Sequence, residues 1–249
     1  MLVGVKSRGD ANSHVDQCYR ALRQLIVSCE IAPGARITEG VLIEQLGFGR
    51  TPVREALLRL RQERLVETRP RSGYVVRPLS RKSVADFFAV WRTIAPLLAK
   101  LGVPNLTAEQ RMDILALGSS REAMHDTDSA ALSRVATAFF DILLKAADNE
   151  PLAYIYSHLG AEMERIYGIF FRTAEGRRWL GSGTEIAAFA NVTDEETAFR
   201  LISNRAIASE TAFMSLMAEW EAAGDTRYVS PETDANEPLR RTKRAQSLQ

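Results

Sequence analysis

The sequence predicts a mainly α-helical protein, with an N-terminal winged helix-turn-helix domain followed by an all-α antiparallel helical bundle. Apolar residues recur at helical spacing through most of the chain, and one β-hairpin pattern interrupts them near residue 70. Charge is divided between two parts: residues 1–80 hold 13 Lys and Arg against 8 Asp and Glu, whereas residues 81–236 hold 15 against 22. A basic domain beside an acidic one is typical of a protein that binds nucleic acid through its basic part.

These patterns predict three segments. Residues 10–78 form the DNA-binding winged helix-turn-helix domain, and residues 79–226 form an all-α domain for effector binding and dimerisation. Residues 227–249 form a flexible basic tail. Its basic run at 240–244 fits either a solvated cationic end or an extra contact with DNA or a partner.

Residues 46–60 are the most informative stretch, because they predict a turn followed by a helix with two different faces. Val53, Ala56, Leu57 and Leu60 recur at the spacing of one buried stripe. Arg50 and Arg54 lie four residues apart at the edge of the opposite face, where guanidinium groups suit guanine edges and phosphates in a major groove. The alternative is an ordinary solvated face in which Glu55 and Arg59 form an i, i+4 ion pair.

The flanking sequence favours the DNA-binding interpretation. A helix is expected over about residues 13–29, a break at 31–34, and a short helix over 39–46. Strands are expected at 65–68 and 74–77, around a basic hairpin tip. The stripe of the first helix is expected to consist of Val15, Cys18, Tyr19, Leu22, Leu25, Ile26 and Cys29. Three helices and such a hairpin make a winged helix-turn-helix.

Residues 15–78 resemble the N-terminal domain of GntR-type bacterial transcription regulators. The matching elements are Pro33-Gly34, Leu46-Gly47, the run from Arg50 to Leu57, Leu60, Leu65-Val66 and Gly73. The resemblance implies a dimer on a palindromic operator, with the recognition helix in the major groove and the wing tip in the adjacent minor groove.

Carried over from this family, Arg50, Thr51 and Arg54 read bases and phosphates, and Arg71, Ser72 and Gly73 are wing contacts. Thr38 and Gly49 complete the expected DNA-binding set. Two positions depart from the family: Gly49 replaces the usual Ser or Thr at the helix N-cap, and Gly40 replaces an Arg that binds phosphate in relatives of the fatty-acid regulator.

The rest of the chain predicts a bundle whose facing helices house a ligand. Helices are expected over 82–102, with a bend at Pro96, and over 107–124, 128–147, 151–173, 193–206 and 208–223. Their order resembles the FCD-type effector domain of the FadR branch of GntR regulators. Most FCD domains hold a metal ion with one Asp and three His. By spacing, those positions fall on Ala136, Phe140, Ala198 and Trp220, and none of these side chains is a metal donor.

The sequence therefore predicts no metal and no cofactor. Phe140 and Trp220 are expected either to fill the cavity or to line it for a metal-free effector. Arg165 and Arg205 are the candidate effector-binding residues, because each could bind a carboxylate. The alternative for both is an ion pair with Asp or Glu on the protein.

Several classes of function are disfavoured. The chain has no GxGxxG, P-loop or G-x-S-x-G motif, so we expect no enzyme. The chain has no run of 18 apolar residues, so we expect no membrane span. The N-terminus lacks the apolar segment of a secretory signal. Cys18 and Cys29, both expected on the first helix, fit core thiols in a reducing cytoplasm.

We therefore expect a ligand-responsive bacterial regulator that is cytoplasmic and acts as a homodimer. Its partners would be a double-stranded DNA operator and an unidentified small-molecule effector, and repression is the usual mode of the resembled family. The alternative is a DNA-binding protein whose helical domain binds no ligand and serves only dimerisation.

Overall fold

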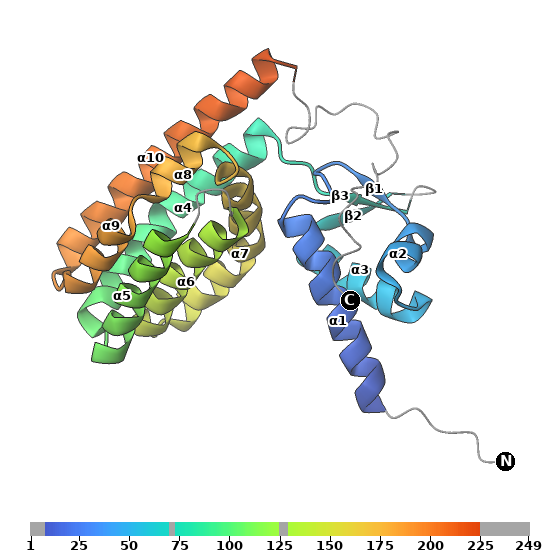
Figure 1. The fold of residues 1–249 in the computed structure, drawn as a ribbon, viewed down its shortest axis with the longest axis horizontal. Helices are drawn as coiled ribbons and strands as arrows, with labels where there is room; N and C mark the ends of the chain where they lie inside the picture. The colour runs from blue at the N-terminus through green and yellow to red at the C-terminus, as the bar shows by residue number, and fades with distance from the viewer. Residues whose placement is uncertain (1–7, 70–72, 125–128, 225–249) are drawn as a thin grey trace. The chain divides into compact units, whose positions relative to one another are not determined.

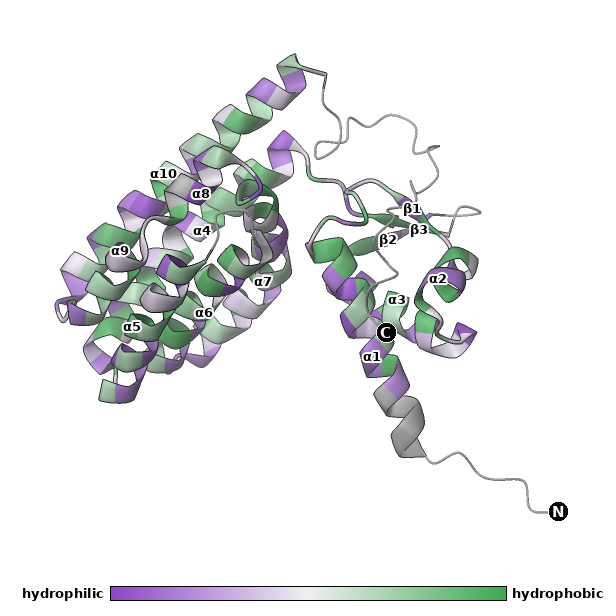
Figure 2. Cartoon of the chain, in the orientation of Figure 1, coloured by the Kyte–Doolittle hydropathy of each residue, from purple (hydrophilic) through white to green (hydrophobic). Residues whose placement is uncertain are grey.

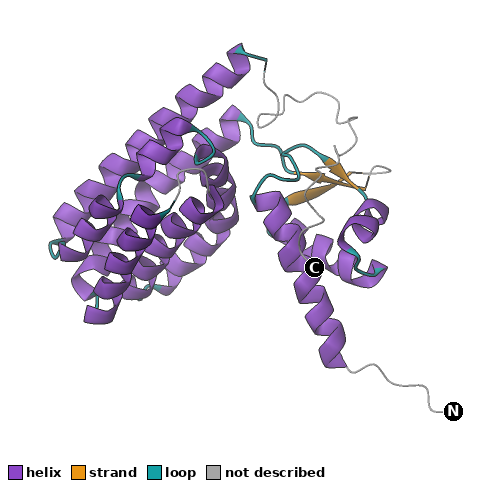
Figure 3. Ribbon diagram, viewed as in Figure 1, coloured by secondary structure: helices purple, strands orange, loops and turns teal. Residues whose placement is uncertain are grey.

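The computed structural model describes residues 8–69, 73–124 and 129–224, which form parts of two compact units. The first unit runs to Leu79 and the second begins at Ser80 (Figure 1). Strands occur only in the first unit among the described residues, and the second is helical throughout (Figure 3). This confirms the predicted fold class.

The first unit contains three helices and a small sheet. Its elements in chain order are α1 (Arg8–Val27), β1 (Arg36–Ile37), α2 (Glu39–Leu46), α3 (Arg50–Gln62), β2 (Val66–Arg69) and β3 (Gly73–Val76). Helix α1 ends two residues before Cys29, which has a positive φ of 54°. The expectation that Cys29 belongs to the stripe of this helix is therefore wrong, although its side chain is buried, as is that of Cys18.

The three strands form an antiparallel sheet in the order β1-β3-β2. The hairpin is the predicted one, displaced by one residue on each strand, because Leu65 still donates its N–H to Leu60 O at the end of α3. Strand β1 was not predicted, since two residues carry no alternation pattern. Gly73 is required where β1 meets β3: its φ is +81°, and a Cβ there would lie 2.9 Å from Ile37 O.

The second unit is built from seven α-helices and two 3-10 turns within its described residues. They are α4 (Arg81–Gly102), η1 (Val103–Asn105), α5 (Ala108–Ala123), α6 (Ser129–Ala147), α7 (Glu150–Phe170), α8 (Ala174–Leu180), α9 (Gly183–Ala188), η2 (Phe189–Asn191) and α10 (Glu195–Ala222). Figure 2 shows hydrophobic and hydrophilic residues interleaved along these helices, as amphipathic helices require. Large side chains wholly withdrawn from solvent include Phe88, Trp91, Phe170, Phe171 and Phe213.

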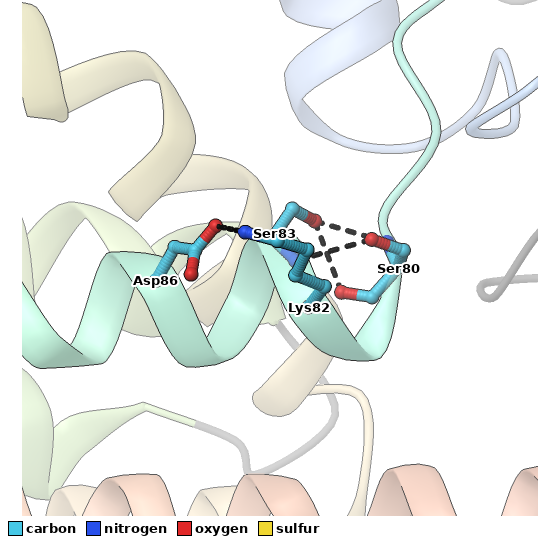
Figure 4. Close-up of polar contacts among 4 residues, drawn as sticks. All are labelled: Ser80, Lys82, Ser83 and Asp86. Atoms are coloured by element: carbon cyan, nitrogen blue, oxygen red, sulfur yellow. Dashed lines mark hydrogen bonds and ion pairs between the residues drawn. The ribbon is translucent and has the colours of Figure 1, made fainter.

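Helix α4 begins with a capping box (Figure 4). Ser80 Oγ accepts from Ser83 N at 3.1 Å, and Ser83 Oγ accepts from Ser80 N at 3.0 Å. One turn on, Lys82 and Asp86 form an i, i+4 ion pair. These contacts fix the first turn of the helical unit directly after the segment that links it to the sheet. The helix then continues through Pro96.

Helix α10 is one continuous helix, so the prediction of two helices over 193–206 and 208–223 is wrong. No glycine or proline lies between Glu195 and Ala222, and the pattern near residue 207 therefore had no chain-breaking residue to support a break. At 28 residues, α10 is about 42 Å long.

Helices α4 and α10 pack antiparallel along their length. Ion pairs join them near both ends and in the middle: Arg81 with Glu221, Arg92 with Glu210, and Lys100 with Glu196. These side chains are partly exposed, so each pair adds little stability, but together they fix the register of the two helices.

Helices α8 and α9 were not predicted. Ser182 and Glu185 carry the S-x-x-E spacing of a helix N-terminus, and Ser182 Oγ accepts from Glu185 N at 3.2 Å. The Gly-Ser-Gly-Thr run at 181–184 therefore includes the start of α9.

The contact between α5 and α9 depends on two glycines. A Cβ on Gly118 would lie 2.5 Å from Gly183 O and 2.8 Å from the Cβ of Ala187. Glu122 Oε2 accepts from Gly183 N at 2.8 Å beside this contact. The α9 segment can therefore pack only while both positions lack a side chain.

We expect Gly118→Ala to lower the free energy of unfolding of the helical unit by about 1–3 kcal/mol, because the new methyl overlaps backbone atoms that cannot move freely. Gly160→Ala is the matched control: Gly160 lies inside α7 with nothing within 4 Å of a Cβ built on it, and Ala should stabilise it by about 0.5–1 kcal/mol. Urea unfolding followed by tryptophan fluorescence measures both, because all three Trp residues lie after Ser80. Equal stability of the two variants would contradict the packing described.

Candidate nucleic-acid interface and ligand cavity

The orientation of α3 is set by a stripe that is entirely withdrawn from solvent. Val53, Ala56, Leu57 and Leu60 all have zero relative exposure, as the spacing predicted. Because one side of the helix is buried, the residues on the other side must face solvent.

Two cations near the interface of α1 and α3 are held by intramolecular pairs. Arg59 Nη1 lies 2.6 Å from Asp16 Oδ1, and Arg23 Nε lies 3.2 Å from Glu63 Oε2. Tyr19 donates its hydroxyl to Glu63, and burial together with this bond raises the pKa of Tyr19 to about 12. The alternative of a Glu55–Arg59 pair is therefore wrong: Arg59 pairs with α1.

Arg50 and Arg54 differ from these cations. Both are exposed, and neither makes an ion pair with any residue in the part of the chain that the structure describes. Thr51 is exposed beside them. Arg61, two turns after Arg54, is also exposed and makes no ion pair with the described residues. The outward side of α3 thus carries three guanidinium groups that no carboxylate of the described fold neutralises, which is the arrangement a polyanion requires.

The N-terminus of α3 has no side-chain cap. Gly49 is the N-cap, with extended φ and ψ of −69° and 169°, and it offers no side chain to the first turn. Pro52 has no N–H, so the backbone donors of the first turn belong to Arg50 and Thr51. These two N–H groups point out of the helix end beside the two guanidinium groups.

Of the other residues expected to bind DNA, Thr38 and Gly73 have structural roles, and the structure does not describe the remaining wing residues. Thr38 is the N-cap of α2, accepting from Val41 N at 3.4 Å, and Gly73 permits the close approach of β1; both have roles in the fold itself. Arg71 and Ser72 lie outside the described residues. Gly40 lies in the open first turn of α2, with nothing within 4 Å of a Cβ built there.

The helical unit contains a partly open cavity of about 710 Å³. It lies among α4, α6, α7, α10 and the α8–η2 segment. Its lining residues are Trp91, Ala95, Val135, Ala136, Thr137, Phe139, Phe140, Met163, Tyr167, Leu180, Glu185, Ile186, Ala188, Phe189, Val192, Leu201, Ile202, Asn204, Arg205, Ala206 and Ala208. This size and this predominantly apolar wall, rich in aromatic rings, are typical of a small-molecule site.

One wall of the cavity carries a short chain of hydrogen bonds. Trp91 Nε1 donates to the Tyr167 hydroxyl at 3.2 Å, and that hydroxyl lies 3.4 Å from Ser209 Oγ. Burial raises the pKa of Tyr167 to about 12, so the hydroxyl stays protonated at neutral pH. Periodicity alone did not indicate that Trp91, Tyr167 and Ser209 would be hydrogen-bond partners, because they lie on three different helices.

Arg205 supplies the only cationic side chain among the residues that line the cavity. Its Nη2 donates to Leu180 O at 3.0 Å and to Glu185 Oε2 at 3.3 Å. The side chains of Arg205 and Glu185 are 36% and 62% exposed, so this ion pair is weak. Glu185, which the sequence did not single out, is the only carboxylate in the lining.

Arg165 does not line this cavity, so the structure places the two candidate effector-binding residues apart, with Arg205 at the cavity and Arg165 outside it. Met163 and Tyr167 face the cavity from α7, and Arg165 lies midway between them, about 200° around the helix from each. Its guanidinium is fully buried elsewhere in the unit and pairs with Glu162 at 3.2 Å.

The four positions expected to correspond to a family metal site do not come together. Ala136 and Phe140 line the cavity, but Ala198 and Trp220 do not. Both lie on α10, 22 residues and about 33 Å apart along its axis. The expectation that Trp220 fills this cavity is therefore wrong; it packs on Phe213 instead. A lining with one carboxylate and no imidazole does not fit a transition metal.

Residues 14–76 match the sequence family described as bacterial regulatory proteins, gntR family. The chain therefore resembles this family in its N-terminal domain. It is 26% identical over 146 residues to the uncharacterized HTH-type transcriptional regulator YdhC of Bacillus subtilis, covering 57% of this chain and 65% of that protein. It is 33% identical over 94 residues to the HTH-type transcriptional repressor RspR of Escherichia coli, covering 38% and 41%. The chain thus spans less than two thirds of the length of these relatives.

The fold of the chain is similar to a solved structure of E. coli McbR/YncC. The TM-score is 0.69 at 20% identity, covering 82% of this chain and 98% of that one. At this identity the likeness concerns the fold alone. Among the helices that the structure describes, none is long and apolar enough to cross a membrane.

Proposed function

We propose that this protein is a ligand-responsive transcription regulator that binds a palindromic DNA operator as a homodimer. The observation that carries the proposal is the outward face of α3, where Arg50 and Arg54 are exposed without intramolecular ion pairs to the described residues. Guanidinium groups bind guanine O6 and N7 in the major groove with two hydrogen bonds, and the N–H groups at the end of α3 suit a phosphate. The family match over residues 14–76 supports this function.

The remaining DNA contacts follow from the family resemblance. Arg71, Ser72 and Gly73 contact DNA from the wing, and Thr38 and Gly49 lie close to the backbone of the duplex. Two such domains are needed to read a twofold operator, so the active form is a dimer held through the helical domain or the segment of α4 between Phe87 and Leu98. Repression is the proposed mode, in line with the relative RspR, which is a transcriptional repressor.

The helical unit, which we assign to the FCD type on the same resemblance, binds the effector in its cavity. The apolar aromatic lining favours a hydrophobic body, and Arg205 favours a carboxylate at its edge. Because Glu185 is largely exposed, an incoming carboxylate exchanges with it at Arg205 at a cost of about 1 kcal/mol or less. The effector is thus an apolar monocarboxylate that needs no metal ion.

For DNA binding, the test is to select duplexes from a random library with the full-length protein and then to titrate single variants. We expect Arg50→Ala and Arg54→Ala each to weaken binding to the selected duplex by about 1–3 kcal/mol, because each removes contacts to base edges. Arg20→Ala is the matched control, since it removes the same charge from an exposed position on α1. An equal loss in all three variants would mean general electrostatics rather than readout by α3.

For the effector, thermal unfolding is measured with octanoate, decanoate and phenylacetate. We expect at least one to stabilise the wild type, by about 2.7 kcal/mol at a concentration of one hundred Kd. Arg205→Gln should lose this stabilisation, and Arg200→Gln, an exposed position five residues earlier on α10, should keep it. If no carboxylate stabilises the protein, or if Arg205→Gln responds fully, the helical domain serves dimerisation alone or takes a ligand of another class.

A further inference from the structure

The outward face of α3 contains an apolar residue that the function proposed above does not use. Leu58 is 38% exposed, and Val41 of α2 is the other large hydrophobic side chain exposed in the described part of the first unit. A single exposed leucine is common on protein surfaces. The position of Leu58 on the helix is what suggests a function for it.

Helical geometry places Leu58 at the centre of the outward face. Leu58 follows Thr51 by seven residues, so the two point within about 20° of the same direction, two turns apart. That direction is nearly opposite to the buried stripe of Val53, Ala56, Leu57 and Leu60, each fully excluded from solvent. A duplex that contacts Thr51 lies in front of Leu58 as well when α3 lies along the groove.

The neighbours of Leu58 set its chemical surroundings. Arg54 is one turn before it and makes no ion pair with the described residues. Arg59, the next residue, is turned away and held by Asp16 at 2.6 Å. Arg61, one turn after Leu58, is exposed on the same edge as Arg54, and Glu55, one turn before Leu58, is exposed on the opposite edge. The outward face thus has guanidinium groups along one edge, a carboxylate along the other, and a hydroxyl and an isobutyl group along its centre.

The distances fit a base-reading role. Leu58 lies eight residues after Arg50, about 12 Å along the helix axis. At about 3.4 Å per base pair, this corresponds to about three to four steps along a major groove. The one apolar group that a base pair presents in that groove is the 5-methyl of thymine, and leucine has no polar atom with which to read any other base edge.

We propose that Leu58 is a specificity-determining residue that packs against the 5-methyl group of a thymine, a few base pairs from the guanine contacted by Arg50 or Arg54. This inference rests on the proposed DNA-binding function and adds a base preference to it. The contact favours thymine over cytosine at one position in each half-site, because cytosine lacks the methyl group and presents an amino group that Leu58 cannot pair.

The test replaces thymines of the selected duplex one at a time by deoxyuridine, which lacks only the methyl group. We expect one thymine in each half-site at which this change weakens wild-type binding about fourfold, the equivalent of burying one methyl group. In Leu58→Ala the same change should have no effect, while the sensitivity at other positions remains. Val41→Ala, the other exposed apolar residue of the unit, is the control and should keep the wild-type response.

The outcomes separate the two proposals. If no duplex is enriched by the full-length protein, the DNA-binding function itself fails, and this inference fails with it. If a duplex is enriched but no thymine is sensitive to loss of its methyl, or if Leu58→Ala keeps that sensitivity, only the role of Leu58 is overturned. Leu58 is exposed and Ala favours helix, so the variant should fold; thermal unfolding confirms that before the titrations.

Discussion

The burial of one stripe of α3 is the constraint on which the rest of the N-terminal unit depends. Four side chains with zero exposure, Val53, Ala56, Leu57 and Leu60, fix the helix against the remainder of the domain. The same packing decides which residues face outward, so stability depends on one side of the helix and the proposed DNA recognition on the other. The pairs of Arg59 with Asp16 and of Arg23 with Glu63 strengthen this arrangement by tying the end of α3 and its C-cap to α1. Cations used in this way are not available to DNA, which leaves Arg50, Arg54 and Arg61 as the cations of α3 that make no ion pair in the described fold.

In the helical unit, the corresponding constraint is the long antiparallel contact of α4 with α10. Both helices line the cavity, through Trp91 and Ala95 on one and residues from Leu201 to Ala208 on the other. The α8–η2 segment covers this space, and it can do so because Gly118 and Gly183 let α9 approach α5 closely. Arg111 holds the end of the segment by donating to Ala190 O at 2.6 Å and to Val192 O at 2.9 Å.

The sequence predicted the structural features that depend on a repeating pattern or on a local motif. The stripe of α3, the hairpin and the starts of α4 and α7 follow from periodicity and capping residues, and the structure has them within one or two residues. Features that depend on tertiary packing were not predictable in the same way. Periodicity did not show which face of α7 lines the cavity. Met163 and Tyr167 lie on that face, and Arg165, between them in sequence, lies on the opposite face. The supposed break in α10 also placed Ala198 and Trp220 on separate helices, and the metal positions carried over from the family were therefore wrong. The spacing of Ser182 and Glu185 is typical of a helix start and is the one local signal in the sequence for α9.

The central claim is that two α3 helices related by a twofold axis read guanines in the major groove. Its most direct test is chemical interference on the selected duplex. Dimethyl sulfate methylates guanine N7 in the major groove and adenine N3 in the minor groove, so one experiment compares the two grooves. We predict that guanine methylation prevents binding at two clusters of positions related by a twofold axis, one in each half-site. Interference confined to adenine N3, or a single cluster of guanines without a twofold-related partner, would contradict it.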